Sequence, residues 1–323
     1  MIDLRIGNPD LLIENISSLA YRTEVASLIT VGMPYNKNGP MDFAVDAIKK
    51  LHQKYHPNLL TPNSRIVVGS GASQLISAFW SLNKRAYVQS PFWFRTPLLA
   101  LKQNSEMIEY KLSQNDVNLV TYPNNPDGAL LISQSKKTWY DSVYLWPWYF
   151  ETNEMFKNAT DELVRAEKAM TIFTLSKMTG HCGTRFGWAV VEDSSLADKL
   201  NEYMEFESGG VSFDAQNKAS AVIHNLLSSD SWQNELAGVQ KELNERKKTL
   251  QEFCIKQNWL YQPSAGMFAW ITTNSDGAVE RLSVFGIMGT CGSKCGGSKK
   301  QIRLNLAVTK DVWTEMLKII GEQ

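Results

Sequence analysis

The chain has 323 residues, and its 33 lysines and arginines balance 33 aspartates and glutamates, so the formal net charge is zero. This balance, without a basic stripe, argues against nucleic acid or an anionic membrane surface as the main partner. No apolar run approaches the roughly 20 residues that span a bilayer, and residues 1–5 lack the layout of a signal peptide. Four cysteines are too few for a disulfide framework in a chain of this size, so we expect a cytoplasmic protein.

Between residues 62 and 195, short apolar strands alternate with helical segments, and each strand ends in a loop rich in Gly, Pro, Asn or Ser. The expected strands cover residues 65–68, 86–88, 118–121, 142–145 and 171–174. This alternation predicts an α/β fold with a mostly parallel, doubly wound sheet. Ligands of such sheets bind outside the carboxyl ends of the strands, where these polar loops gather.

The second half of the chain has a different character. Residues 195–257 have the spacing of long helices, with an interruption at 209–212. From residue 259 onward, two strands (266–271 and 301–306) and a closing helix predict a small α+β lobe. We therefore expect a large domain over residues 31–210, and a small domain with connecting helices over residues 1–30 and 211–323. The N-terminal segment joins the small domain because chain termini commonly lie close together.

Lys177 is the most informative residue of the chain. It follows an apolar run and lies in a loop of small hydroxyl and glycine residues. Burial disfavours the charged form of a lysine, and the free amine is a nucleophile for an aldehyde. The hydroxyls of Thr174 and Ser176 and the guanidinium of Arg185 are suited to hold a phosphate beside this amine. Together these groups predict a site for pyridoxal 5′-phosphate (PLP).

A second motif, Asn125-Pro126-Asp127-Gly128, accompanies the lysine segment. With both motifs, the chain resembles the fold-type I PLP-dependent aminotransferase class, and in particular the tryptophan aminotransferase and alliinase family, from Gly7 to Leu304. The resemblance implies a PLP-dependent transferase of fold type I and a homodimer with its sites at the subunit boundary. Tyr35 and residues 211–214 are then expected to reach the partner's phosphate.

The resemblance also assigns chemical roles. Lys177 matches the lysine that forms the Schiff base and then acts as general base at the substrate α-carbon. Asp141 matches the carboxylate that pairs with the pyridinium nitrogen and keeps the ring an electron sink. Tyr144, expected three residues further along the same strand, matches the tyrosine that reaches the ring hydroxyl oxygen. Asn125 matches the asparagine that binds the same oxygen.

Further positions match residues that hold the cofactor and the substrate. Trp93 matches the aromatic residue that stacks on the pyridine ring. Gly71, Ala72 and Ser73 open a helix whose first N–H groups suit a phosphate, and Arg303 matches the arginine that clamps the substrate α-carboxylate. The expected cofactor-binding set is Gly71, Ala72, Ser73, Trp93, Asn125, Asp141, Tyr144, Thr174, Ser176, Lys177, Arg185 and Tyr35. The expected substrate-binding set is Arg303, Asn125 and Gly7.

Each of these residues taken alone also fits an ordinary structural role, but seven positions in family order do not. Some positions depart from the family pattern: Tyr122 replaces an asparagine, Leu145 replaces a second tyrosine, and Ala72 removes a hydroxyl from the phosphate turn. Cys291 and Cys295 have a spacing seen in metal sites, but no histidine lies near them in the sequence, so we expect no metal.

The favoured reaction is transamination of an L-amino acid to a 2-oxo acid. A PLP-dependent lyase or cyclase, eliminating a β- or γ-substituent as in an alliinase-like C–S lyase, is the alternative, because the shared residues serve both reactions. A third hypothesis is a catalytically inactive binding module, against which the intact Lys177, Asp141 and Arg303 argue. The aromatic residues Phe92, Trp93, Trp146 and Trp148 fit an aromatic or apolar substrate side chain if they surround the pocket, and they equally fit a place in the core.

Overall fold

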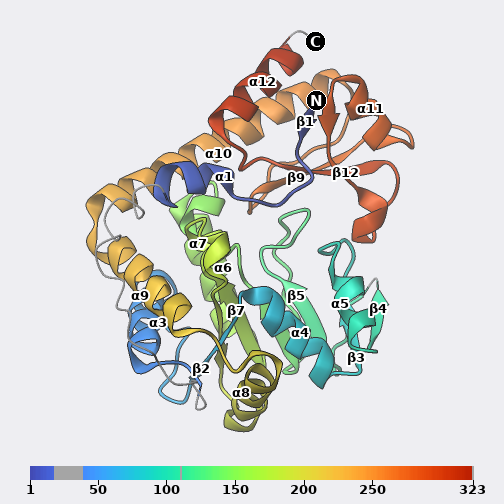
Figure 1. Ribbon diagram of the computed structural model, residues 1–323. Helices are drawn as coiled ribbons and strands as arrows, with labels where there is room; N and C mark the ends of the chain where they lie inside the picture. Colours follow the sequence, from blue (N-terminus) through green and yellow to red (C-terminus); the bar gives the residue numbers. More distant parts are fainter. Residues whose placement is uncertain (18–38, 110, 322–323) are drawn as a thin grey trace.

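The computed structural model describes residues 1–17, 39–109 and 111–321 (Figure 1). Its centre is a seven-stranded sheet of order β2-β8-β7-β6-β5-β3-β4. Only β8 among these strands runs antiparallel to its neighbours, so the prediction of a mostly parallel sheet in an α/β fold is confirmed. The strands are β2 (Arg65–Gly69), β3 (Arg85–Val88), β4 (Glu106–Glu109), β5 (Asn118–Thr121), β6 (Thr138–Asp141), β7 (Met170–Thr174) and β8 (Gly187–Val191).

The sheet is covered by helices on both faces, as its continuous apolar strands require. Successive residues of β7 point to opposite cores: Phe173 packs in the core that includes α3 and α6, and Ile172 in the core that includes α4 and α8. The helices around the sheet are α3 (Asp42–Tyr55), α4 (Ala72–Leu82), α5 (Thr96–Lys102), α6 (Asn153–Arg165) and α8 (Ser194–Ser208). Short helical turns are η2 (Pro147–Tyr149), α7 (Leu175–Met178) and η3 (Cys182–Thr184).

Two long helices, α9 (Phe213–Ser228) and α10 (Asp230–Lys256), lead away from the sheet. The predicted interruption at 209–212 is confirmed, and Gly209 ends α8 in the left-handed conformation with φ 67°. A second break at Ser229 was not predicted. The Ser229 hydroxyl accepts a hydrogen bond from the Trp232 N–H, which caps the start of α10.

The remaining elements form a smaller lobe at the upper side of Figure 1. Its antiparallel sheet has the order β11-β12-β9. A parallel pair, β1 with β10, brings the start of the chain onto this lobe. Its elements are β1 (Ile2–Asp3), α1 (Asp10–Leu12), η1 (Ile13–Ser17), β9 (Phe268–Thr272), α11 (Ala278–Val284), β10 (Ile287–Met288), β11 (Thr290–Cys291), η4 (Gly292–Cys295), β12 (Gln301–Asn305) and α12 (Lys310–Gly321). The domain boundaries at residues 30 and 210 stay a prediction.

One expected strand was wrong by four residues. The strand is β6 (Thr138–Asp141), and residues 142–145 form the turn that follows it, closed by a hydrogen bond from the Leu145 N–H to the Ser142 carbonyl. Asp141 is therefore the last residue of the strand, and Tyr144 lies on the turn. Among the described residues, none of the helices combines the length and the apolar character of a bilayer-spanning segment.

Candidate active site

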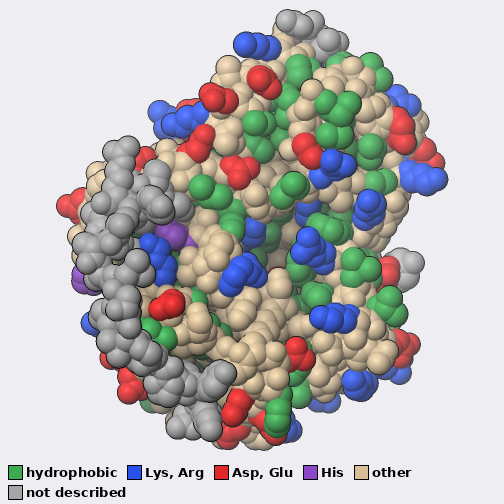
Figure 2. Space-filling view, in the orientation of Figure 1, with side chains coloured by type: hydrophobic (Ala, Val, Ile, Leu, Met, Phe, Trp, Pro, Cys, Tyr) green, Lys and Arg blue, Asp and Glu red, His purple; other side chains and the backbone are tan. Residues whose placement is uncertain are grey.

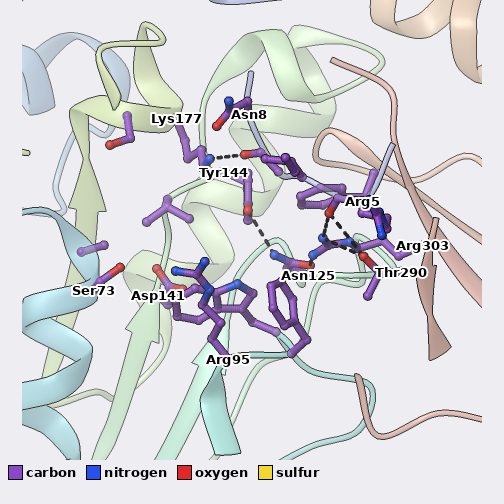
Figure 3. A pocket seen from close by; sticks show the side chains of 18 of the residues that line it. Arg5, Asn8, Ser73, Arg95, Asn125, Asp141, Tyr144, Lys177, Thr290 and Arg303 are labelled. Atoms are coloured by element: carbon purple, nitrogen blue, oxygen red, sulfur yellow. Dashed lines mark hydrogen bonds between the residues drawn. The ribbon is translucent and has the colours of Figure 1, made fainter. Parts of the chain in front are cut away.

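A cavity of about 700 Å³ lies where the carboxyl ends of β6 and β7 and the start of α4 face the small antiparallel sheet (Figure 3). Most of the predicted site residues line it. The lining includes Gly7, Ala72, Ser73, Trp93, Asn125, Asp141, Tyr144, Thr174, Ser176, Lys177, Arg185 and Arg303. Residues spread over almost 300 positions of sequence thus meet in one place, at the edge of the sheet where ligands are expected.

Lys177 reaches the cavity from α7, directly after β7. The Thr174 hydroxyl accepts the Ser176 N–H, which starts the helical turn, and the Tyr149 hydroxyl donates to the Lys177 carbonyl at 2.8 Å. The Lys177 Nζ donates to the Gly7 carbonyl at 2.5 Å. Burial lowers the pKa of Lys177, and the cationic Arg303 and Arg185 act in the same direction. Cys182 and Asp10 oppose this shift, whose net direction is toward the free amine, the form that attacks an aldehyde.

Asp141 is 5% exposed, and its Oδ1 has no hydrogen-bond partner among the described residues. Burial raises the pKa of this carboxyl to about 7, although the nearby Lys177 opposes the rise. A buried carboxylate oxygen without a donor is costly for a folded protein. Such an oxygen, at the floor of a cavity, is suited to a ligand that brings a proton or a positive charge.

Tyr144, Asn125 and Arg303 form a hydrogen-bonded chain on the other wall of the cavity (Figure 3). The Asn125 Nδ2 donates to the Tyr144 hydroxyl at 3.2 Å, and the Arg303 Nη1 donates to the Asn125 Oδ1 at 2.8 Å. The Arg303 guanidinium also lies 4.2 Å from the centre of the Phe268 ring. Burial lowers the pKa of Arg303. The chain fixes a planar, buried cation in the cavity wall, which suits a carboxylate.

The start of α4 and Arg185 form another corner of the cavity. Gly71 precedes α4 with φ 80°, and a Cβ at this position would lie 2.4 Å from the Arg185 Nη2. Arg185 donates to the Ser70 and Cys182 carbonyls, which holds its guanidinium beside the first turn of α4. The corner combines a helix N-terminus, hydroxyls and a guanidinium, the donor groups that bind phosphate.

Three of these features fit the expected cofactor: Lys177, Asp141 and the corner at the start of α4. PLP carries a phosphate, a ring nitrogen and an aldehyde. The corner at the start of α4 is suited to the phosphate, the unpartnered Asp141 oxygen to the ring nitrogen, and the partly buried Lys177 amine to the aldehyde. Gly187 adds a steric observation, since a Cβ there would lie 2.6 Å from the Ala72 nitrogen and would disturb the same corner. The donor set and the absence of side chains at Gly71 and Gly187 are therefore consistent with PLP.

Three predicted residues around the pocket were placed wrongly. Phe92, Trp146 and Trp148 are 4%, 0% and 3% exposed and do not line the cavity. Trp146 stacks on Trp148 at 5.7 Å in the core below the sheet, because the turn after β6 points both rings away from the cavity. Tyr35 lies outside the described residues. Residues 211–214 lead into α9 and do not line this cavity.

Other lining residues were missed by sequence reasoning. They come from the N-terminal segment, from the residues after Trp93 and from the small lobe: Arg5, Ile6, Asn8, Phe94, Arg95, Phe268, Val279, Met288, Thr290, Cys291 and Lys294. Phe94 and Arg95 directly follow the matched Trp93, and Ile6 and Asn8 flank the predicted Gly7, so a neighbouring matched residue is the sequence signal that these four carry. The others reach the cavity through the packing of the two lobes, which no local pattern reveals.

Comparisons with known proteins agree with this geometry. A family model described as Allinase matches residues 40–323. Tryptophan aminotransferase-related protein 3 of Arabidopsis thaliana is 25% identical over 344 residues, covering 89% of this chain and 71% of the relative. Tryptophan aminotransferase-related protein 2 of the same plant is 33% identical over 55% of this chain, and alliin lyase of Allium cepa var. aggregatum is 33% identical over 40%. These two matches span only 42% and 26% of the relatives.

Solved structures share the fold. Aspartate aminotransferase from Thermotoga maritima superposes with a TM-score of 0.72 at 19% identity, covering 99% of this chain and 91% of that one. A double mutant of Thermus thermophilus aspartate aminotransferase gives 0.75 at 16% identity, covering 100% and 91%. The family match covers most of the chain, and the superpositions cover nearly all of it. The chain therefore belongs to the allinase family of fold-type I enzymes, whose cofactor is pyridoxal 5′-phosphate.

Proposed function

We propose that this protein is an aminotransferase that converts an L-amino acid to a 2-oxo acid. The observation that carries the proposal is one cavity that holds a partly buried lysine amine, an unpartnered buried carboxylate oxygen and a buried arginine. Lys177, Asp141 and Arg303 supply these groups. They provide an amine for the aldehyde, an anion for the ring nitrogen and a cation for the substrate carboxylate.

When bound, PLP supplies an electron sink for the electron pair released at the substrate α-carbon. Asp141 would hold the proton of the ring nitrogen at its free Oδ1. Tyr144 and Asn125 would donate to the ring hydroxyl oxygen, and Trp93 would cover one face of the ring. The phosphate would be held by Ser73, Thr174, Ser176 and Arg185 together with the backbone at Gly71 and Ala72.

For the substrate, Arg303 would bind the α-carboxylate, with Asn125 orienting the guanidinium and Gly7 closing the cavity. Lys177 would take the proton from the α-carbon through its Nζ, and the lowered pKa of this amine supports such a role. The expectation of an aromatic or apolar substrate side chain now rests on Trp93 and on four lining residues that were not predicted, namely Phe94, Phe268, Val279 and Met288. That expectation stays a prediction.

A lyase is the second candidate. The alliin lyase relative, 33% identical over 130 residues, supports it. The residues assigned above stabilise negative charge at the α-carbon in either reaction, so they do not separate the two. The difference lies in whether a leaving group departs from the side chain.

One experiment separates these candidates. The PLP-loaded protein is mixed with L-phenylalanine, L-tryptophan, L-leucine, L-glutamate or an S-alkyl-L-cysteine, without added 2-oxo acid, and products are quantified. Transamination yields at most one equivalent of 2-oxo acid per active site and no ammonia. A lyase releases ammonia over many turnovers. No product from any of a full panel of amino acids would contradict both candidates.

We also propose a homodimer in the cytoplasm. The family's sites lie at the subunit boundary, and Tyr35 and residues 211–214 are candidates to complete the partner's phosphate corner. Analytical ultracentrifugation of the PLP-loaded protein tests the dimer. A monomer at micromolar concentration with full activity would contradict it.

A further inference from the structure

More basic than acidic side chains line the cavity. Among the described residues that line it, six are basic, and Asp141 is the one carboxylate. The cations are Arg5, Arg95, Lys177, Arg185, Lys294 and Arg303. Figure 2 shows several Lys and Arg side chains gathered around the hollow between the two lobes. The cofactor phosphate and one α-carboxylate account for only part of this charge.

Four of the six cations have a partner or an assigned task. Arg5 pairs with Asp3 at 2.6 Å. In the proposed function, Lys177 is the reacting amine, Arg185 binds the phosphate and Arg303 binds the α-carboxylate. Arg95 and Lys294 are left, and neither has a carboxylate partner in the described part of the chain.

Arg95 and Lys294 are held on neighbouring segments. The Phe92 N–H donates to the Cys295 carbonyl at 2.8 Å, which joins the segment before α5 to η4. Gly296 packs so close to this joint that a Cβ there would lie 2.5 Å from the Phe92 ring. The ring of Phe94, next to Arg95, lies 5.4 Å from the Arg303 guanidinium. The two unassigned cations therefore line the same cavity from two segments that are hydrogen-bonded to each other, and one of these segments contacts Arg303 through Phe94.

In place of the aromatic or apolar side chain expected from the sequence, we propose that the substrate is an L-amino acid whose side chain ends in an anion, a carboxylate or a sulfonate. Arg95 and Lys294 would bind this anion while Arg303 holds the α-carboxylate. The apolar lining residues Val279 and Met288 would contact the methylene part of such a side chain. This inference rests on the proposed function of the cavity as an amino-acid site. Both side chains are exposed although they line the cavity, so they stay charged in contact with solvent and can form charge-assisted hydrogen bonds with an anionic group that enters it.

The test uses ligands that do not react. Binding of succinate, glutarate and adipate to the PLP-loaded protein is measured by calorimetry and compared with butanoate, pentanoate and hexanoate. Each pair has the same carbon chain and differs only in the second carboxylate. We expect the best dicarboxylate to bind at least about 10-fold more tightly than its partner, the size of one charge-assisted contact.

Variants then assign the effect to residues. Arg95→Met and Lys294→Met each lower the affinity for the best dicarboxylate about 10-fold and leave monocarboxylate binding within about twofold. The matched control is Lys299→Met, an exposed lysine of the same loop that does not line the cavity. It should change neither affinity. In the single-turnover assay, L-glutamate or L-cysteate should likewise react faster than L-glutamine, and both variants should remove that difference.

The outcomes are distinct. If dicarboxylates bind no more tightly than monocarboxylates while neutral amino acids still yield 2-oxo acid, the inference is wrong and the proposed function stands. If the dicarboxylate preference survives in both variants, or falls equally in Lys299→Met, the assignment to Arg95 and Lys294 is wrong. If no acid binds and no amino acid reacts, the proposed function itself is contradicted.

Discussion

At the residue scale, one buried oxygen atom of Asp141 is central to the chemistry of the site. Its Oδ1 has no donor among the described residues, and burial raises the carboxyl pKa from 3.8 to about 7. In the cofactor-free protein this carboxyl is a source of instability, because folding favours its protonated form. A bound pyridinium N–H would remove that cost by providing a charged donor. Asp141 therefore links cofactor binding to the stability of the fold.

The raised pKa of Asp141 makes the stability of the cofactor-free protein depend on pH. Because the folded-state pKa is raised, the stability contributed by the protonated carboxyl is fully present below pH 3.8 and is lost as the pH rises to 7. The loss is on the order of 4 kcal/mol. Without PLP, Asp141→Asn should thus be more stable than the wild type at pH 7 and about equal near pH 4, in thermal melts across this range.

With PLP, the same variant should lose activity by about 10²- to 10³-fold, the usual cost of removing one preorganised charge partner. PLP should also raise the melting temperature of the wild type more than that of Asp141→Asn. A variant that keeps full activity, or that gains as much stability from PLP as the wild type does, would contradict the pairing with the ring nitrogen.

At the scale of elements, α3 is joined to the sheet by two buried histidines. The Trp188 Nε1 donates to the His52 Nε2 at 2.8 Å, the two Nδ1 atoms lie 3.1 Å apart, and the His56 Nε2 bonds the Leu145 carbonyl at 2.8 Å. An indole N–H only donates and a carbonyl only accepts, so the chain is complete when both rings are neutral and each carries one proton. Protonation of either ring places two N–H groups face to face.

Burial lowers the pKa of His52, and it lowers that of His56 to about 4. A folded-state pKa below the ordinary value of 6.5 means that the stability contributed by the neutral histidines is present above pH 6.5 and is lost as the pH falls to 4. The loss for His56 alone is on the order of 3 kcal/mol. In urea unfolding of the PLP-loaded protein between pH 4.5 and 7.5, His56→Phe should flatten this dependence. The exposed His224, changed to Asn, is the control and should leave the slope unchanged.

The helices and strands also show which parts of the fold could be predicted from the sequence. The carboxyl ends of β5 and β7, the start of α4 and the lysine turn could be predicted because each combines an apolar run with polar or glycine residues. Strand β6 was misplaced, since Thr138-Trp139-Tyr140-Asp141 carries polar and aromatic residues while the following Val143 and Leu145 look more strand-like. Burial in the sheet, and not local pattern, decides between these two segments. Strand β4 was missed because its two glutamates mark a polar edge strand.

At the scale of the whole molecule, residues 5–8 tie the lobes together. Their carbonyls accept hydrogen bonds from Arg303 and Asn305 of β12 and from Lys177 of α7, the turn that follows β7. No sequence pattern foretold this, because it depends on how the two lobes pack. The segment therefore closes the cavity through backbone groups.

Asn305 tests this arrangement. Its Nδ2 donates to the carbonyls of Ile6 and Asn8 at 2.9 and 2.7 Å. Asn305→Ala leaves both without this donor and should lower the free energy of unfolding by about 1–3 kcal/mol. The KM for the amino acid should also rise, because the segment that covers the cavity is held less firmly. Denaturant unfolding and steady-state kinetics measure the two effects, and unchanged values for both would show that the segment is held by other contacts.

In the proposed function, Lys177 is the amine that joins the cofactor. The most direct measurement is borohydride reduction of the PLP-loaded protein, which makes the bond between lysine and cofactor permanent, followed by mass mapping of its peptides. We expect the cofactor on Lys177, and no labelled peptide in Lys177→Ala. Cofactor on another lysine, or a wild-type protein that carries none after reduction, would contradict it.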